Sequence, residues 1–337
     1  MIKEALVKVI SKKDLSFEEA REAVEEIMSG EVSPVVISSF LTALSMKGET
    51  DEEIAGAAEG MRSKALSFDN DCTVLDIVGT GGDKSNSFNI STTAAFVAAA
   101  NGIKIAKHGN RAASSKCGTA DCLEAVGVKI DCDTELMKKS IEENNISFLF
   151  AQKYHSAMRF VGPVRKELGI RTIFNVLGPL TNPAHANQMV LGVFSREFVP
   201  KIAKALTKLG VTDALVVYGL DCLDEISACS ETAVAEVRDG VITEYTIKPE
   251  DFGYERVDKS GLLGGTPEEN SQIVKNVLSG NGTKAQNTAV IMNAGACMYV
   301  ADRSITFAEA VKKAEETLMS GRGYDILQKF IKTTNEG

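Results

Sequence analysis

The sequence predicts an α/β protein in which a mostly parallel sheet is flanked by helices and joined to a smaller all-helical domain. Its 337 residues suit two domains better than one hydrophobic core, and its 44% hydrophobic content is that of an ordinary globular protein. Helix-start signals crowd the first 65 or so residues, whereas from Thr73 onward short apolar runs alternate with helical segments. The change of pattern near residue 70 indicates two domains of different class.

The amino-terminal segment carries the start and stop signals of several helices. N-cap chemistry fits at three places: Ser16 with Glu19, Ser33 followed by Pro34, and Thr50 with Glu53. Gly30 and Gly48 fit the ends of the helices before them. We therefore expect a helical domain over residues 1–70.

The remaining chain alternates strands and helices. Its first unit is the apolar run 74–78, the glycine loop 79–83 and an Ala-rich helix from near Ser91. Further strands are expected at 103–106, 147–150, 189–193 and 214–217, helices at 120–126 and 135–144, a β-hairpin at 234–237 and 241–245, and capped helices from Thr266 and Thr306. Such alternation implies a mainly parallel sheet covered by helices.

Prolines and glycines interrupt this alternation between residues 151 and 187, at Pro163, Gly178-Pro179 and Asn182-Pro183. This stretch is interpreted as a return to the helical domain, which the chain rejoins at about 163–187. The α/β domain is then expected over residues 71–162 and 188–337.

Composition excludes several classes of protein. The formal net charge of -9 and the isoelectric point near 5.1 argue against a nonspecific binder of nucleic acid. The first ten residues contain Lys3, Glu4 and Lys8, unlike a signal peptide, and no run of about 18 apolar residues predicts a membrane span. We expect a cytoplasmic protein without nucleic-acid or membrane partners, whose seven scattered cysteines are mostly buried, reduced thiols.

Two neighbouring motifs favour phosphate binding. The loop Gly79-Thr80-Gly81-Gly82-Asp83 follows a strand and precedes a helix, where glycines let backbone amides approach an anion. Asp83 would repel a bare pyrophosphate, and a metal-bound phosphate would remove that objection. The segment 89–92 opens the next helix and offers side-chain oxygens and free amides. An ordinary βα turn and plain N-capping by Ser91 are the alternatives.

The strongest local signal is the segment from Lys107 to Lys116, at the end of a predicted strand. It concentrates three cations, two hydroxyls and a glycine where open α/β sheets place their sites. Lys and Arg supply charge and fork geometry for phosphate, and small residues let amides surround it. A solvated basic loop is the alternative, made less attractive by the acidic composition.

Three further positions carry weaker signals. Asp224-Glu225 follows a predicted strand and suits Mg²⁺, which prefers oxygen ligands, although a solvated turn has the same composition. His155 and Arg165 lie in the irregular stretch, where a guanidinium could hold the carboxylate of an aromatic substrate. A structural or solvated role is the alternative for each.

Taken together, GTGGD, NIST, KHGNRAASSKCGTADCLEAVG, NVLGPLTNP and LDEIS occur in an order and spacing that resembles anthranilate phosphoribosyltransferases over essentially the whole chain. The resemblance implies a nucleoside phosphorylase/phosphoribosyltransferase-like fold and a homodimer with the active site between its domains. It implies transfer of the phosphoribosyl group of phosphoribosyl pyrophosphate to anthranilate in tryptophan biosynthesis, with two Mg²⁺ ions.

The resemblance also assigns residues. Phosphoribosyl pyrophosphate would be held by Gly79, Gly82, Asp83, Ser87, Asn89, Ile90, Ser91, Thr92, Lys107, His108, Gly109, Asn110, Arg111, Ala112, Ala113, Ser114, Ser115 and Thr119. Anthranilate would contact Gly79, His108, Asn110, His155, Arg165 and Pro179, while Ser91, Asp224 and Glu225 match metal ligands. Lys107, Asp224 and Glu225 would be catalytic. Cys117 and Thr119 depart from the commonest family pattern, since serines are frequent there.

Displacement at the anomeric carbon passes through an oxocarbenium-like state, so electrostatics and positioning should carry the catalysis, with no obligatory general base. A pyrimidine nucleoside phosphorylase of similar fold is the nearest rival, but it has no need of paired magnesium carboxylates. A non-catalytic nucleic-acid-binding relative would show a basic face and a degraded phosphate loop. The net charge and the intact GTGGD speak against it.

Overall fold

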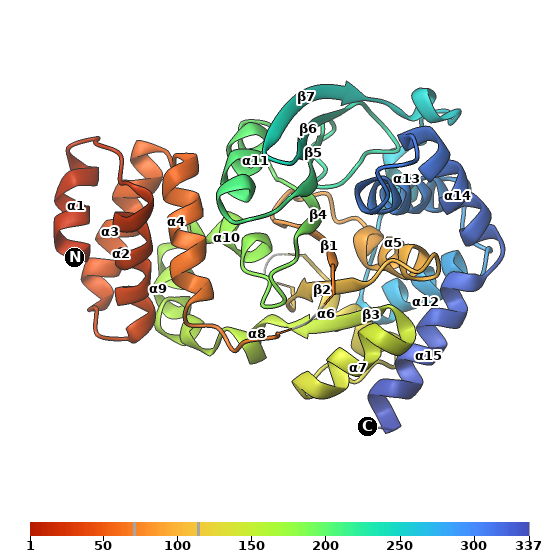
Figure 1. Ribbon diagram of the computed structural model, residues 1–337, viewed down its shortest axis with the longest axis horizontal. Helices are drawn as coiled ribbons and strands as arrows, with labels where there is room; N and C mark the ends of the chain where they lie inside the picture. Colours follow the sequence, from red (N-terminus) through yellow and green to blue (C-terminus); the bar gives the residue numbers. More distant parts are fainter. Residues whose placement is uncertain (70–71, 113–114, 337) are drawn as a thin grey trace.

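A seven-stranded sheet forms the centre of the molecule (Figure 1), a computed structural model that describes residues 1–69, 72–112 and 115–336. Its strands are β1 (Leu75–Gly79), β2 (Ile105–Gly109), β3 (Ile146–Phe150), β4 (Gln188–Gly192), β5 (Asp213–Gly219), β6 (Thr232–Arg238) and β7 (Val241–Ile247). They lie in the order β3-β2-β1-β4-β5-β6-β7, with β1 to β5 parallel and the last two pairings antiparallel. The predicted mostly parallel sheet and its β6–β7 hairpin are confirmed.

Four amino-terminal helices form a bundle to one side of the sheet (Figure 1): α1 (Ile2–Ile10), α2 (Phe17–Ser29), α3 (Pro34–Lys47) and α4 (Asp51–Arg62). Reciprocal capping boxes start α2 at Ser16 and α4 at Thr50, as predicted. Gly30 ends α2 with a φ of 82°, a left-handed conformation that favours glycine. Ser33 makes no side-chain capping bond, so α3 begins with Pro34 alone as its start signal.

The irregular stretch returns to this bundle through α8 (Ala151–Tyr154), a 3-10 turn at Ser156–Phe160, α9 (Gly162–Leu168) and α10 (Phe174–Leu180). Val164 and Leu177 are buried in the same apolar cluster as Ile37 of α3. That cluster continues into β4 and α11 (Phe198–Lys208). The packing agrees with a return to the bundle, and the exact domain limits stay a prediction because one core crosses them.

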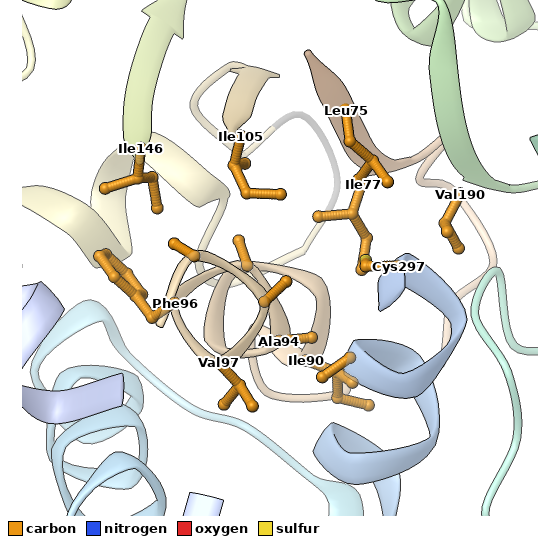
Figure 2. Packing of buried hydrophobic residues seen from close by; sticks show 14 of the residues in the cluster. Leu75, Ile77, Ile90, Ala94, Phe96, Val97, Ile105, Ile146, Val190 and Cys297 are labelled. Carbon is orange, nitrogen blue, oxygen red and sulfur yellow. The ribbon is translucent and has the colours of Figure 1, made fainter. Parts of the chain in front are cut away.

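The opposite face of the sheet is covered by a second set of helices: α5 (Ile90–Ala99), α6 (Thr119–Val126), α7 (Thr134–Asn144), α12 (Pro267–Leu278), α13 (Lys284–Ala301), α14 (Phe307–Met319) and α15 (Arg322–Glu336), with 3-10 turns at Pro249–Phe252 and Lys259–Leu262. Helix α5 is buried on all its sides and consists mostly of apolar residues, which suits its place packed against the strands (Figure 2). Cys297 of α13 lies beside Ile77 in this layer.

Some details differ from the sequence predictions. Strand β2 begins at Ile105 instead of residue 103 and reaches Gly109, so Lys107 and His108 lie within the strand. Helix α5 begins at Ile90 after Asn89, and Ser91 does not cap it.

All seven cysteines are free thiols, four of them buried. Across the described ranges, no helix is long and apolar enough to cross a membrane.

Candidate active site

A cavity of about 360 Å³ lies at the carboxyl edge of the sheet, where β1 ends and α5 begins. Ten of the predicted site residues line it: Gly79, Gly82, Asp83, Ser87, Asn89, Ser91, Ser115, Thr119, Asp224 and Glu225. The cavity therefore brings together side chains from motifs that lie far apart in the chain. Ile90 and Thr92 are buried behind it, in the first turn of α5.

The glycine loop adopts a backbone that other residues would resist. Gly81 and Gly82 have φ values of 69° and 75°. The Gly81 amide donates a 2.6 Å hydrogen bond to Oδ2 of Asp224, and the Thr80 amide donates to the Gly192 carbonyl at 2.9 Å. The loop is thus fixed to β4 and to the acidic segment after β5.

Carboxylates converge on one side of the cavity. Burial and the neighbouring Asp83 raise the pKa of Asp224 to about 7. Burial and Asp224 raise the pKa of Glu225 well above its usual range. Glu225 Oε1 accepts a 2.9 Å bond from the Ser91 amide, while its buried Oε2 has no hydrogen-bond partner in the described chain. A divalent cation would satisfy this oxygen and remove the repulsion.

The protein alone does not enclose such a cation. No group of three His, Cys, Asp or Glu side chains in residues 1–69, 72–112 and 115–336 is arranged to hold a metal. Mg²⁺ is commonly bound by one or two carboxylates together with water and substrate phosphates. The oxygen-rich cavity fits that mode of binding.

Lys107 extends from β2 beneath the cavity floor, buried on the α5 side of the sheet. Its ammonium donates to the Ile77 carbonyl and lies 3.4 Å from Oγ of Ser91. Burial lowers the pKa of Lys107, against the opposing effect of nearby carboxylates. The lysine is therefore not a solvated surface cation.

His108 points to the other face of the sheet, as strand alternation requires. Its Nδ1 lies 3.2 Å from the carbonyl of Gly178, and its ring meets that of His155 edge-on at 5.1 Å between centroids. Burial lowers the pKa of His108 to about 3 and that of His155 to about 4, so both rings are neutral. Pro179 is buried in α10, one residue after Gly178.

Within the described chain, His108 Nε2 and both nitrogens of His155 are buried without a well-formed hydrogen bond, although the Thr181 backbone slightly raises the His155 pKa. These unpaired groups lie beside α10. They are suited to receive polar groups of a ligand.

The loop after β2 is directed outward. Asn110 is exposed and accepts from Gln152 at 3.3 Å. Arg111 pairs with Asp121 and Glu124, and the Ala112 amide donates to Asp121. Gly109 packs against Thr119. The cavity is not lined by Gly109, Asn110, Arg111 or Ala112. Ala113 and Ser114 lie outside the described residues.

Arg165 lies in α9, with its guanidinium 5.5 Å from the centre of the Phe174 ring. Burial lowers its pKa, and no ion pair or hydrogen bond of its side chain is formed in the part of the chain that the structure describes. A half-buried guanidinium without an anion can accept a carboxylate. It does not line the cavity itself.

Gly81, part of the predicted glycine loop, also lines the cavity, and sequence reasoning assigned no site role to six further lining residues: Lys84, Ser85, Asn86, Phe88, Cys117 and Gly118. Most of them lie between predicted site residues, so the spacing of the motifs was the signal that could have found them. It also missed Asp76 and Asn182, two buried polar residues just below the site. Asp76 stands out in the sequence as a charge inside an apolar strand.

Residues 3–65 match the helical bundle domain of a glycosyl transferase family, and residues 71–324 match the a/b domain of a glycosyl transferase family. The chain is 53% identical to the anthranilate phosphoribosyltransferase of Methanobrevibacter smithii, over 99% of this chain and 100% of that protein. It is 51% identical to that of Lachnoclostridium phytofermentans, over 99% of each chain.

Solved structures agree. The anthranilate phosphoribosyltransferase of Thermus thermophilus is 45% identical, with a TM-score of 0.93 over 98% of this chain and 99% of that one. That of Saccharomyces cerevisiae, in complex with phosphoribosyl pyrophosphate and Mg, is 32% identical, with a TM-score of 0.90 over 100% and 98%. This chain belongs to the anthranilate phosphoribosyltransferase family.

Proposed function

We propose that the reaction takes place in the cavity at the carboxyl edge of the sheet, with the aromatic substrate on the α9–α10 side of it. The reaction is transfer of the phosphoribosyl group of phosphoribosyl pyrophosphate to anthranilate, which gives N-(5-phosphoribosyl)anthranilate and pyrophosphate in tryptophan biosynthesis. The observation that carries this placement is the joining of the glycine loop to Asp224 through the Gly81 amide.

Phosphate oxygens would be bound by the loop amides, the amino-terminal turn of α5 and the hydroxyls of Ser91, Ser115 and Thr119. Ser91, Asp224 and Glu225 would hold two Mg²⁺ ions with the pyrophosphate. The metal, when bound, supplies positive charge that offsets the charge of the leaving group. The unpartnered Glu225 Oε2 and the raised pKa values of both carboxylates support this assignment.

Lys107 adds a fixed positive charge at the floor of the cavity, close to Ser91. The charge of a buried ammonium is weakly screened, so it stabilises developing negative charge more than an exposed lysine would. Arg165 would pair with the anthranilate carboxylate, and Asn110, His108, His155 and Pro179 would line the aromatic side. No residue needs to act as an obligatory base, because the amine of anthranilate is already a neutral nucleophile.

A direct assay tests the proposal. The purified protein is incubated with anthranilate, phosphoribosyl pyrophosphate and Mg²⁺, and both pyrophosphate release and anthranilate consumption are measured. Equal amounts of both, abolished by a chelator, are expected. A parallel incubation with pyrimidine nucleosides and phosphate tests the phosphorylase rival, and turnover there alone would refute the proposal.

The homodimer and the cytoplasmic location are also proposed. The chain has a mass of 36.0 kDa, and a homodimer would show twice that mass in light scattering. A monomeric mass at working concentration would refute it.

A further inference from the structure

The pairing of the sheet is interrupted between β1 and β2, the third and second strands from one edge. Strands β1 and β4 pair through five residues each, as do β2 and β3. In the described chain, β1 and β2 pair only where Leu75 meets Ile105. Beyond Leu75 and Ile105 the two strands have no further paired residues in the described chain, and we call this unpaired stretch the gap.

Side chains occupy this gap and satisfy the facing backbone groups. Asn182 Nδ2 donates to the Ala106 carbonyl at 2.8 Å. The His108 amide donates to Oδ1 of Asp76 at 3.3 Å. Lys107 reaches across in the other direction, to the carbonyl of Ile77. Three hydrogen bonds made by side chains thus replace the backbone hydrogen bonds that would otherwise join β1 and β2 as a parallel pair.

Asp76 and Asn182 are joined to each other as well. Asn182 Nδ2 lies 2.7 Å from Asp76 Oδ2, and Asn182 Oδ1 accepts from the Ala184 amide at 2.8 Å. Both side chains are almost completely buried, with 0% and 1% exposed. A buried carboxylate is costly, and burial raises the pKa of Asp76 to about 6. An apolar residue would be expected at this place in a parallel strand.

We propose that Asp76 and Asn182 form a polar wedge, defined by these two residues, that sets the separation of β1 from β2 and so positions the two halves of the active site. Strand β1 ends in the glycine loop, whereas β2 carries Lys107 and His108. Asn182 follows α10, so the wedge also ties the Gly178 carbonyl, which contacts His108, to the sheet. Both are positioning residues, since neither lines the cavity.

The wedge predicts a specific kinetic defect, which rests on the proposed function. If β1 and β2 shift relative to each other, each substrate still meets its own groups but the reacting atoms are misaligned. Asp76→Asn and Asn182→Ala should therefore lower kcat by tenfold or more and change either KM by less than threefold. Asp76→Asn keeps the shape of the side chain. Its new NH2 group, however, must face either the Asn182 side-chain amide or the His108 backbone amide, so two donors meet.

A matched control separates positioning from stability. Asn144 in α7 is also buried, at 5% exposed, and donates to Ser140 and Thr333, far along the chain from the site. Asn144→Ala should lower the melting temperature without changing kcat. Wild-type kcat in folded Asp76→Asn and Asn182→Ala, or an equal fall in Asn144→Ala, would overturn the wedge.

Hydrogen exchange supplies a readout that needs no catalysis. Without substrates, the amides of residues 106–109 should exchange faster in Asn182→Ala than in wild type. Their exchange rate in Asn144→Ala should equal that of wild type. If the wild-type protein made no product, the proposed function would fail while this measurement still tested the wedge. Unchanged exchange in folded Asn182→Ala would refute the wedge even where kcat fell.

Discussion

Gly79 lies so close to Asp224 that a Cβ atom on residue 79 would stand 2.4 Å from the carboxylate Oδ2. The same oxygen accepts from the Gly81 amide, so it cannot move aside without releasing the glycine loop. Gly192 is closer still, because a Cβ atom on residue 192 would lie 1.5 Å from the backbone carbonyl oxygen of Asp224. The position of the acidic segment is therefore set by two glycines on neighbouring strands.

Gly79→Ala should displace the Asp224 carboxylate, because a Cβ would stand 2.4 Å from Oδ2 and 2.9 Å from Cγ of that side chain. The sheet should survive, since the Asp224 backbone carbonyl, at 3.2 Å, needs to shift only slightly. We expect kcat/KM to fall by about tenfold to a hundredfold and the Mg²⁺ requirement to rise, as from a loss of roughly 1.4 to 3 kcal/mol. A magnesium titration of the steady-state rate measures both. Gly162→Ala is the control, since a Cβ there would contact nothing within 4 Å.

Lys107→Met removes the buried ammonium and keeps the length of the side chain. Turnover should fall by roughly a hundredfold, the effect of losing one fixed group aimed at developing charge, and the KM for phosphoribosyl pyrophosphate should rise. Stability should also fall by about 1–3 kcal/mol, because the Ile77 carbonyl loses its partner. Rates are therefore measured well below the melting temperature.

Lys104→Met provides the comparison, as Lys104 precedes β2 at the opposite edge of the sheet. It should retain wild-type kinetics. A Lys107→Met enzyme with unchanged turnover and substrate affinity would remove Lys107 from the catalytic group.

Arg165→Ala should weaken the binding of anthranilate alone. Its guanidinium lies beside Phe174 with no anionic partner among the described residues, so a carboxylate ligand would fill an open position. The KM for anthranilate should rise by tenfold or more, in line with the loss of about 1.5–3 kcal/mol from a charged hydrogen bond. Lys166→Ala, next to it and exposed, should leave both KM values unchanged. A rise confined to phosphoribosyl pyrophosphate would show that Arg165 is misassigned.

The fold was predictable because its signals are local. Capping boxes at Ser16 and Thr50 and glycine ends such as Gly30 fix helices through contacts within a few residues. Convergence of the glycine loop with Asp224 was predictable too, since parallel strands bring their carboxyl ends to one edge. The opposite directions of Lys107 and His108 were not predicted, because the strand was expected to end at residue 106; they follow from strand alternation once β2 is seen to reach Gly109.

The wedge could not have been derived this way. Asp76 and Asn182 lie 106 residues apart, and no local pattern pairs them. In the sequence, Asn182 precedes a proline and so indicates only a turn. The start of α5 near Ser91 was predicted, but the alternative of plain N-capping by Ser91 is not found: the Ser91 amide is bound by Glu225, 134 residues away. Long-range polar contacts decide both cases.

Acid should destabilise the protein through its buried histidines. The pKa of His155 is about 4 in the folded state against 6.5 as a model value, so the unfolded state binds more protons between these pH values. Stability from this group is present above pH 6.5 and is lost as the pH falls toward 4. Between pH 7 and 4.5 the loss is about 2 kcal/mol, at 1.36 kcal/mol per pKa unit.

Urea unfolding of wild type and His155→Gln at both pH values measures this contribution. The variant should lose about 2 kcal/mol less than wild type between pH 7 and 4.5. Asp76 and Asp224, whose raised pKa values act in the opposite direction, are common to both proteins and cancel in the comparison. Equal losses in the two proteins would contradict a buried neutral His155.

The replacement of Asp224 by Asn together with Glu225 by Gln tests the metal site most directly. It keeps size and most hydrogen bonding, including an acceptor for the Gly81 and Ser91 amides, while removing the charges that Mg²⁺ requires. Because both carboxylates have raised pKa values from burial, the fold should survive, as circular dichroism will show. Activity should fall by a factor on the order of hundreds, since several kcal/mol of charge stabilisation is lost at about 1.4 kcal/mol per tenfold. The residual activity should need more Mg²⁺, and a folded double variant with the wild-type magnesium response would reduce Asp224-Glu225 to a buried turn without a metal.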